Sequence, residues 1–292
     1  MTNMITNDIL KKIKYIEICT KRLLSGSLVG DSRSAIKGSG FEFDQIREYQ
    51  IGDDVRFLDW KSSARTGKLL VKQYIEERNR TIILAVDISG SSFFTSSKIS
   101  KWDLFQQIAA VLTLVAEYGR DNVSLILFSD ELELCIPPGR GRMHIQAILH
   151  NIFSWKPKKK QTCISAVLKQ LAKMKRTDAV VFIVSDFIVH DAEPLLSVVA
   201  KMYDLIAVRS LDRYEQQIPA VGFLHVEDIE TGQQILLDTR GKNRAQLEKY
   251  VQDRVAQQNR LFKKYNVDCL ELIDHKSLIA DIIRFFRRRM MY

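Results

Sequence analysis

Three short apolar runs restrict the fold of this chain more than any other feature of its sequence. They cover residues 82–86, 123–128 and 179–184, and each is a nearly continuous series of Val, Ile, Leu, Phe and Ala. A run of this length without regular polar alternation is typical of a strand that is buried on both faces. Stretches with helical periodicity separate the runs, so the sequence predicts an α/β domain with a mostly parallel central sheet and helices on both faces.

The segments between the runs supply the helices of this predicted domain. Ser100 and Asp103 form a capping-box pattern at the start of a helix. Residues 131–136 follow a Ser-Asp turn and are expected to pair with the strand before them, and the two prolines that come next are expected to end this partner strand. The other elements expected here are helices over residues 142–153, 164–174 and 192–202 and a strand over residues 205–208.

The amino-terminal part of the chain lacks this alternation. Residues 5–24 have the spacing of an amphipathic helix, and residues 25–40 are rich in Gly and Ser. Residues 41–74 mix charges of both signs with large aromatic side chains and end in a predicted strand over residues 69–74. Because buried charges need partners, we expect an Arg–Asp network of half-buried side chains that joins this segment to the main domain. A docking surface for a partner protein is the alternative.

After Pro219 the sequence predicts a carboxyl-terminal extension. Its expected elements are a hairpin with its turn at Thr231-Gly232, a charged helix over residues 244–265, a strand over residues 267–273 and a basic amphipathic helix over residues 277–290. We therefore expect three parts in the chain: an amino-terminal helix and arm (residues 1–78), a central domain (residues 79–215), and a hairpin with basic helices (residues 216–292).

Composition limits the class of protein. Of 292 residues, 44 are Lys or Arg and 35 are Asp or Glu, and the formal net charge of +9 permits an acidic partner without requiring one. The four cysteines form no CxxC pair, which favours a reduced, intracellular protein. No signal-peptide pattern is visible, so we expect a cytoplasmic location. The longest apolar stretch, residues 104–116, is too short to span a bilayer, so no transmembrane segment is expected.

Oxygen-bearing side chains gather at the carboxyl edge of the predicted sheet. Asp87 ends the first apolar run, and Ser89 and Ser91 follow it at alternate positions. Asp186 follows the third run, and Thr162 precedes the helix that leads into that run. Ligands bind at this edge in open α/β sheets, and oxygen donors without nitrogen or sulfur suit a hard divalent cation. The sequence therefore predicts a site for Mg²⁺, with Mn²⁺ and Ca²⁺ as alternatives.

Each part of this pattern also has an ordinary structural explanation. An Asp-x-Ser-x-Ser series occurs by chance in about one chain of this length in ten to twenty. Thr162 alone is typical of a helix N-cap, and Asp186 alone is typical of a turn. Their joint position at one sheet edge is what favours a metal site. The coordination positions left over would take water or an acidic side chain of another protein.

Two groups of residues resemble known families. Asp87, Ser89, Ser91, Thr162 and Asp186 resemble the metal-ion-dependent adhesion site of von Willebrand factor A domains. The arm resembles the hallmark of domain-of-unknown-function family fifty-eight, von Willebrand A-like proteins associated with MoxR ATPases. The matching residues are Gly40-Phe41-Glu42-Phe43, Arg47-Glu48-Tyr49, Gly52-Asp53-Asp54 with Arg56, and Asp59-Trp60 with Ala64-Arg65. The resemblance covers about residues 20–215 and departs at Ser92, where many members have Met or another apolar residue.

This resemblance implies a Rossmann-like von Willebrand factor A domain with a non-enzymatic role. It implies an adaptor that works with a MoxR-type AAA+ ATPase in the assembly or maturation of client complexes. It also implies that the client offers an acidic side chain to a Mg²⁺ ion held by the five residues named above. The charged segment beyond about residue 220 is not explained by the resemblance.

Two other functions remain open from the residues themselves. Asp87 after a strand also suits the nucleophile of a Mg²⁺-dependent phosphatase, but Ser89 stands where such chemistry needs a second aspartate as acid and base. The basic runs at residues 156–160 and 284–289 suit nucleic acid or anionic lipid, which makes peripheral membrane contact a further alternative. Charge runs are usually solvated faces, and no nucleic-acid motif accompanies them, so nucleic acid is the least favoured partner.

Overall fold

The computed structural model forms two compact units, Asp31–Asn79 and a larger unit that includes Arg80–Tyr292. It describes residues 41–50, 53–76, 80–93, 100–157, 161–174, 179–187, 193–210, 212, 217–227, 232–272 and 278–290. The helix predicted over residues 5–24 and the loop predicted over residues 25–40 lie outside this part of the chain.

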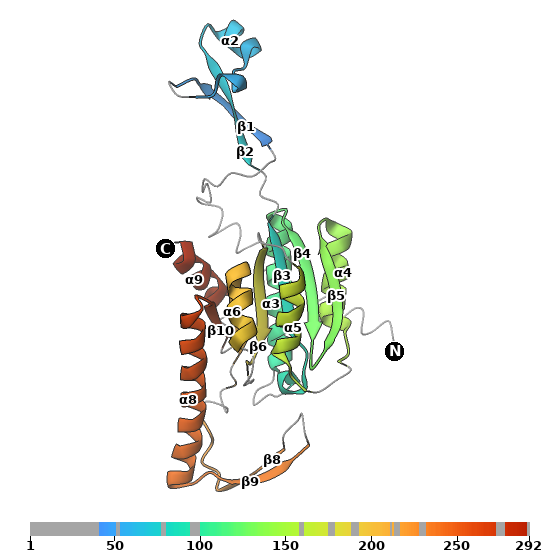
Figure 1. Cartoon of the computed structure of the whole chain (residues 1–292), viewed down its shortest axis with the longest axis vertical. Helices are drawn as coiled ribbons and strands as arrows, with labels where there is room; N and C mark the ends of the chain where they lie inside the picture. The colour runs from blue at the N-terminus through green and yellow to red at the C-terminus, as the bar shows by residue number, and fades with distance from the viewer. Residues whose placement is uncertain are drawn as a thin grey trace. The chain divides into compact units, whose positions relative to one another are not determined.

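The larger unit is built on a six-stranded sheet with the order β10-β7-β6-β3-β4-β5 (Figure 1). All neighbouring strands are parallel except β4 and β5, which confirms the predicted α/β class with a mostly parallel sheet. Counted along the chain, this is the doubly wound order 3-2-1-4-5-6. The strands are β3 (Thr81–Asp87), β4 (Asn122–Phe128), β5 (Leu132–Gly139), β6 (Ala179–Ser185), β7 (Asp204–Ser210) and β10 (Asp268–Leu272).

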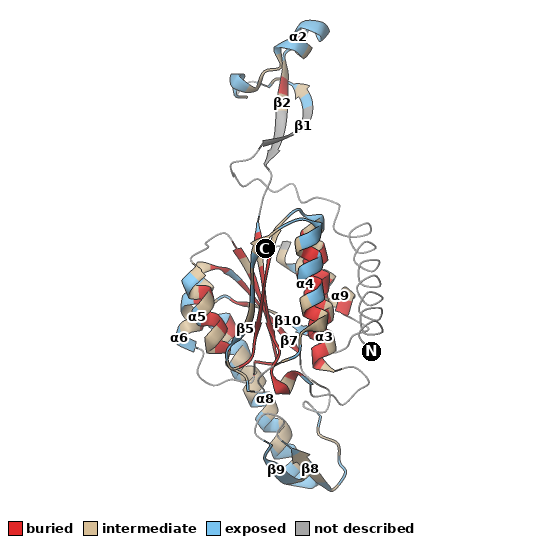
Figure 2. Ribbon diagram, turned by 90° about the vertical axis from the view of Figure 1, so that its right-hand side faces the viewer, coloured by how far each residue is buried: buried red, intermediate tan, exposed pale blue. Residues whose placement is uncertain are grey.

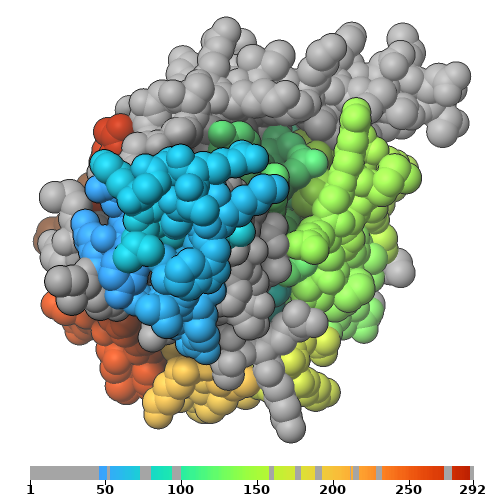
Figure 3. All heavy atoms as spheres, turned by 90° about the horizontal axis from the view of Figure 1, so that it is seen from above, coloured from blue at the N-terminus to red at the C-terminus, as the bar shows by residue number. Residues whose placement is uncertain are grey.

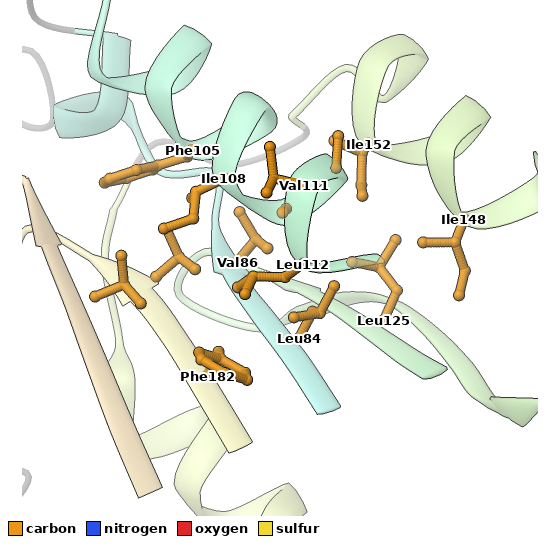
Figure 4. Close-up of a cluster of buried hydrophobic side chains, with 14 of the residues drawn as sticks. Leu84, Val86, Phe105, Ile108, Val111, Leu112, Leu125, Ile148, Ile152 and Phe182 are labelled. Atoms are coloured by element: carbon orange, nitrogen blue, oxygen red, sulfur yellow. The ribbon is translucent and has the colours of Figure 1, made fainter. Parts of the chain in front are cut away.

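Helices cover both faces of the sheet (Figure 2). Leu84 and Val86 of β3 point to the face under α3, α4 and α9, and the alternate residues Ile83 and Ala85 point to the face under α5, α6 and one end of α8. Figure 4 shows the first of these two cores, with Phe105 of α3 among its buried side chains. The helices are α3 (Lys101–Tyr118), α4 (Arg142–Ser154), α5 (Ile164–Met174), α6 (Glu193–Met202), α8 (Gly241–Lys264) and α9 (Leu278–Met290).

Most of the elements predicted for the larger unit are confirmed within one or two residues. The capping box of Ser100 and Asp103 is present at the start of α3. The expectation that the two prolines end the hairpin strand is wrong, because β5 continues through Pro137 and Pro138 to Gly139. The reason is topological: β5 is an edge strand, where a residue without an N–H group can face away from the ladder.

The segment after Pro219 combines a hairpin with elements of the main core. β8 (Phe223–Glu227) and β9 (Gln234–Asp238) form the expected antiparallel hairpin, with Thr231 outside the described residues. β10 extends the central sheet beside β7, and Leu278, Ile282 and Phe285 of α9 are buried in the first core. No helix in the described part of the chain has the length and apolar character needed to cross a membrane.

The smaller unit, here called the arm, pairs β1 (Phe41–Glu48) with β2 (Leu70–Glu76) as an antiparallel ribbon. A short 3-10 turn and helix α2 (Trp60–Thr66) connect the two strands, and Asp59 caps α2 by accepting the N–H of Ser62. The described residues of the arm form a compact group of blue and cyan spheres in Figure 3. The strand predicted over residues 69–74 is therefore present, and it pairs within the arm.

Ion pairs connect neighbouring parts of the arm. Arg47 makes two hydrogen bonds of 2.7 Å to the two carboxylate oxygens of Asp53, and this contact lowers the pKa of Asp53 to about 2. Arg56 pairs in the same way with Asp54. The Arg–Asp pairing that the sequence predicts is present within the arm, and its role in joining the arm to the main domain stays a prediction. The expected half-burial holds for Arg47 and Asp53, whose side chains are 36% and 20% exposed, and is wrong for Arg56, whose side chain is 82% exposed. Only Ser63 of the seven residues of α2 is buried, because so short a helix covers little of its own surface.

Candidate metal centre

The predicted metal residues lie at the point of the sheet where the strand order reverses. This switch point separates β3 from β6, which are parallel neighbours. Asp87 is the last residue of β3, and Asp186 directly follows the last residue of β6, so both carboxylates leave the sheet at the same edge. Asp87 is fully buried and Asp186 is 1% exposed. The switch point is where open α/β sheets bind their ligands.

Both carboxylate oxygens of Asp87 accept hydrogen bonds. Oδ1 accepts the backbone N–H of Ser89 at 2.9 Å, and Oδ2 accepts the hydroxyl of Ser185 at 2.6 Å. Burial and repulsion from Asp186 nevertheless raise the pKa of Asp87 to about 7, because the two hydrogen bonds only partly oppose these effects. A cation bound at this edge would oppose that shift, since it would favour both ionised carboxylates.

Three hydroxyl groups lie in a row beside Asp87 at this edge of the sheet. Ser89 Oγ lies 3.1 Å from Ser91 Oγ, which in turn lies 3.5 Å from Thr162 Oγ1. Thr162 reaches this position because the next residue, Cys163, donates its N–H to the carbonyl of Ser129 after β4. The structure thus brings the three predicted hydroxyls into one series beside Asp87.

The spacing of these oxygens fits a hard divalent cation. Adjacent ligands of an octahedral Mg²⁺ ion are about 2.9 Å apart, and those of a Ca²⁺ ion about 3.3–3.7 Å apart, from metal–oxygen distances of about 2.0–2.1 and 2.3–2.6 Å. The observed separations of 3.1 and 3.5 Å fall in this range. In the described residues no three His, Cys, Asp or Glu side chains cluster, so the donors here would be two carboxylates and three hydroxyls. Such a set suits Mg²⁺ or Ca²⁺ better than a soft metal.

Two further residues belong to the site and were not predicted from the sequence. Ser185 binds Asp87, as described above, and Lys101 places its ammonium nitrogen 3.4 Å from Oδ2 of Asp186. Lys101 is only 3% exposed although it is the first residue of α3. A sequence signal for it exists, because a cation in the first turn of a helix opposes the helix dipole and therefore calls for another explanation. Ser185 carries no comparable signal.

The loop that carries Asp186 is fixed to α8. Phe187 has a positive φ of 54°, and its ring packs edge-to-face on Phe262 with a centroid separation of 5.2 Å. Gln258, one helical turn before Phe262, binds the carbonyl of Phe187 and also accepts a hydrogen bond of 2.8 Å from the buried Arg209. The carboxyl-terminal part of α8 therefore supports one wall of the candidate site.

A large cavity lies elsewhere in the unit. Its volume is about 590 Å³, and α8, β10 and α9 line it with charges of both signs, including Lys263, Glu271, Asp281 and Arg284. None of the five predicted metal residues lines this cavity. The chemistry predicted from the sequence therefore belongs to the sheet edge.

Comparisons with known proteins place this geometry in context. A family model described as "Protein of unknown function DUF58" matches residues 45–259. The uncharacterized protein Mb1516 of Mycobacterium bovis is 27% identical over 281 residues, which cover 95% of this chain and 88% of that protein. The uncharacterized protein YeaD of Bacillus subtilis is 39% identical over 49 residues, or 17% of this chain and 12% of that protein.

A solved structure also has some similarity to the chain. The conserved hypothetical protein BatB from Bacteroides thetaiotaomicron aligns with a TM-score of 0.47 and 15% sequence identity. The alignment covers 73% of this chain and all of the BatB chain.

Proposed function

Since this chain belongs to the DUF58 family of proteins of unknown function, we propose from its own site that it is a metal-dependent protein-interaction module. Asp87, Asp186 and the hydroxyls of Ser89, Ser91 and Thr162 would hold one divalent cation, with Mg²⁺ as the first candidate. The bound cation supplies a Lewis-acidic position for an oxygen ligand. An acidic side chain of a partner protein is the ligand that this position suits best.

The observation that carries this proposal is the series of oxygens at the switch point. Two buried carboxylates and three hydroxyls from separate segments converge there, with hydroxyl separations of 3.1 and 3.5 Å. Repulsion between Asp87 and Asp186 makes their closeness unfavourable unless a proton or cation lies between them. A fold that keeps both carboxylates at this edge is well suited to binding a cation.

The topology supports assignment to the von Willebrand factor A type of fold. The sheet has the doubly wound order 3-2-1-4-5-6, with its third strand antiparallel at one edge. Four of the predicted adhesion-site residues, Asp87, Ser89, Ser91 and Asp186, lie at or just after the ends of the first and fourth strands of that order. This agreement between topology and residue positions goes beyond the motif itself, because chance occurrence of Asp-x-Ser-x-Ser does not select the switch point.

The arm supports a role with a second protein. Val55 and Trp60 are 61% and 68% exposed, so both side chains are accessible to a partner protein, and tryptophan is enriched at the energetic centres of protein interfaces. The family resemblance implies a MoxR-type AAA+ ATPase as the partner, and we extend the proposal to it. In this scheme the arm binds the ATPase and the metal edge binds an acidic side chain of a client, and the protein acts as an adaptor between them.

An enzymatic role has less support. A phosphatase of the acyl-phosphate type needs a second acid and base two residues after its nucleophile, and that position holds Ser89, whose N–H binds Asp87. Both oxygens of Asp87 accept hydrogen bonds from the protein, which suits a fixed ligand better than an attacking nucleophile. An assay of the purified protein with Mg²⁺ and a generic phosphomonoester distinguishes a phosphatase from an adaptor. Turnover that disappears in Asp87→Asn would contradict the adaptor proposal.

Capture of a purified MoxR-type ATPase from the same organism, with its client, tests the adaptor role. The ATPase itself uses Mg²⁺ with ATP, so chelation alone does not discriminate, and variants must be compared at constant Mg²⁺. Wild type and Ser92→Ala should form the ternary complex, because the Ser92 hydroxyl binds a backbone carbonyl and no site carboxylate. Asp87→Ala should lose the client and keep the ATPase. Equal recovery of the client by Asp87→Ala and wild type would contradict the proposal.

A further inference from the structure

Lys101 is a buried cation whose ammonium nitrogen lies beside the candidate metal centre. Its side chain is 2% exposed, and the nitrogen is 3.4 Å from Oδ2 of Asp186, whose side chain is not exposed at all. Removing an ammonium group from water is costly unless charged or polar partners replace its hydration. The fold retains Lys101 at this position although the first turn of α3 is unfavourable for a cation.

The position of Lys101 is fixed by the fold. Ser100 caps α3 and shares the capping box with Asp103, so the first turn of the helix begins at a defined point. The next residue, Trp102, is buried in the core under this face of the sheet. Asp186 is held in turn by the loop that packs on α8. The ammonium group is therefore held in position at the site, unlike the end of a surface lysine side chain that can turn away into solvent.

The positive charge of Lys101 changes the net charge of the site to which a metal cation binds. With both carboxylates ionised, Asp87 and Asp186 contribute two negative charges and Lys101 one positive charge. A divalent cation then brings the group to a net charge of +1. One further negative charge from outside brings it to zero. Like charges held a few ångströms apart at a buried site repel strongly, so the cation binds less tightly when Lys101 is present.

We propose that Lys101 is a built-in counter-cation that weakens binding of the divalent metal until an anionic side chain completes the centre. The inference rests on the proposed function, and it concerns the regulation of the same site. It makes metal binding and binding of an acidic partner mutually dependent, because each supplies charge that favours the other. A module of this kind would hold its metal firmly only in the complex.

The test measures Mn²⁺ binding to the full chain by titration calorimetry, without any partner. Lys101→Met should bind Mn²⁺ at least about tenfold more tightly than wild type, since one charge this close changes a neighbouring site's affinity for a proton by about tenfold to a thousandfold. Lys101→Arg keeps the charge and should bind about as weakly as wild type. Equal or weaker binding by Lys101→Met than by wild type would overturn the inference.

A second measurement covers the case in which Lys101→Met is poorly folded without metal. Its thermal unfolding midpoint is recorded with EDTA and with saturating Mn²⁺, and Lys101→Gln is treated in the same way. Mn²⁺ should raise the unfolding midpoint of both neutral variants more than it raises that of wild type, because tighter binding to the folded state stabilises it more. Failure of both to fold with and without Mn²⁺ would overturn the inference.

The outcomes separate this inference from the proposed function. If wild type binds Mn²⁺ and Lys101→Met binds it no more tightly, the counter-cation role is contradicted and the proposed function is not. Binding by Lys101→Met with none by partner-free wild type at millimolar Mn²⁺ supports both the counter-cation role and the metal centre, because the inference holds that wild type binds the metal firmly only in the complex. Absence of binding in every variant contradicts both.

Discussion

Ser185 donates a hydrogen bond of 2.6 Å from its hydroxyl to Oδ2 of Asp87, across the boundary between two neighbouring parallel strands. The same hydroxyl accepts the backbone N–H of Phe187 at 3.1 Å, which leaves its single proton directed at the carboxylate. The N–H of Ser89 holds the other carboxylate oxygen. Asp87 is therefore held in one orientation before any ligand arrives, and Ser185 is a positioning residue for the candidate metal centre.

Removal of the Ser185 hydroxyl should weaken metal binding. Ser185→Ala is expected to lower the affinity for Mn²⁺ by about 10–100-fold, the usual cost of removing a group that orients a metal ligand. Titration calorimetry measures this directly. Ser92→Ala is the matched control, because Ser92 is equally buried but donates to the backbone carbonyl of Asp87. Unchanged affinity in Ser185→Ala, or an equal loss in Ser92→Ala, would contradict the assigned role.

The stability of the metal-free protein should depend on pH through Asp87. The folded protein raises the pKa of this carboxyl from 3.8 to about 7, so it binds the proton more tightly than the unfolded chain does. The stabilisation by the proton is complete below about pH 4 and is lost as the pH rises through 7. At 1.36 kcal/mol per pKa unit the loss is about 4 kcal/mol.

Urea unfolding in EDTA at several pH values between 4 and 8 measures this effect. Wild type should lose stability over this range relative to Asp87→Asn, which cannot ionise. Saturating Mg²⁺ should reduce the difference, because the metal favours the ionised carboxylate and competes with the proton. Parallel stability curves for the two proteins in EDTA would show that Asp87 does not titrate in this range.

Periodicity and strand-end position predicted much of this architecture. The apolar runs at residues 82–86, 123–128 and 179–184 all lie in central strands, because burial on both faces leaves a strong compositional signal. The meeting of Ser91 with Thr162 was expected from their places after β3 and before α5, and the N–H of Cys163, bound to the carbonyl of Ser129, brings Thr162 to the same edge.

The strand position of two prolines and the roles of Lys101 and Ser185 depend on tertiary contacts, which cannot be predicted from the local sequence. Pro137 and Pro138 remain in a strand because β5 lies at the edge of the sheet. The sequence around the prolines does not show that β5 is an edge strand. Lys101 has the residue type of a surface helix position, and its contact with Asp186 is a tertiary feature that the sequence does not show. Nothing in the sequence distinguishes Ser185 from any other serine in a strand, because its partner Asp87 lies on a different strand.

Arg209 should be a major contributor to stability. Its guanidinium is fully buried and binds Gln258 and Asn259 of α8 at 2.8 and 2.7 Å, and it pairs with Glu271 of β10. Arg209→Met leaves these groups without their partner, so the free energy of unfolding should fall by about 2–4 kcal/mol.

Chemical denaturation measures this loss, with an exposed ion pair as the control. Lys264 and Glu193 pair at 2.8 Å with side chains that are 62% and 48% exposed. Lys264→Met should cost less than about 1 kcal/mol, because water screens the pair and solvates each partner alone. Similar costs for Lys264→Met and Arg209→Met would show that the buried contacts do not support α8 as described.

The exposed aromatic side chain of the arm should contribute to ATPase binding. Trp60→Ala is expected to raise the dissociation constant for a MoxR-type ATPase by about tenfold or more, as is usual for a tryptophan at the centre of an interface. The unfolding midpoint should stay nearly unchanged, because the side chain is 68% exposed. Surface plasmon resonance measures the affinity, with the adjacent exposed Lys61→Ala as control. An unchanged affinity in Trp60→Ala would exclude this side chain from the contact.

Calorimetric titration of the metal-free protein with Mn²⁺, for wild type and for Asp87→Ala, is the decisive test of a metal centre at the sheet edge that carries Asp87 and Asp186. Wild type is expected to bind one ion per chain. Asp87→Ala, folded by circular dichroism, is expected not to bind it, because the fully buried carboxylate is lost from the centre. Binding of equal affinity in the two proteins, or no binding by either wild type or Lys101→Met, would contradict a metal centre at this edge of the sheet.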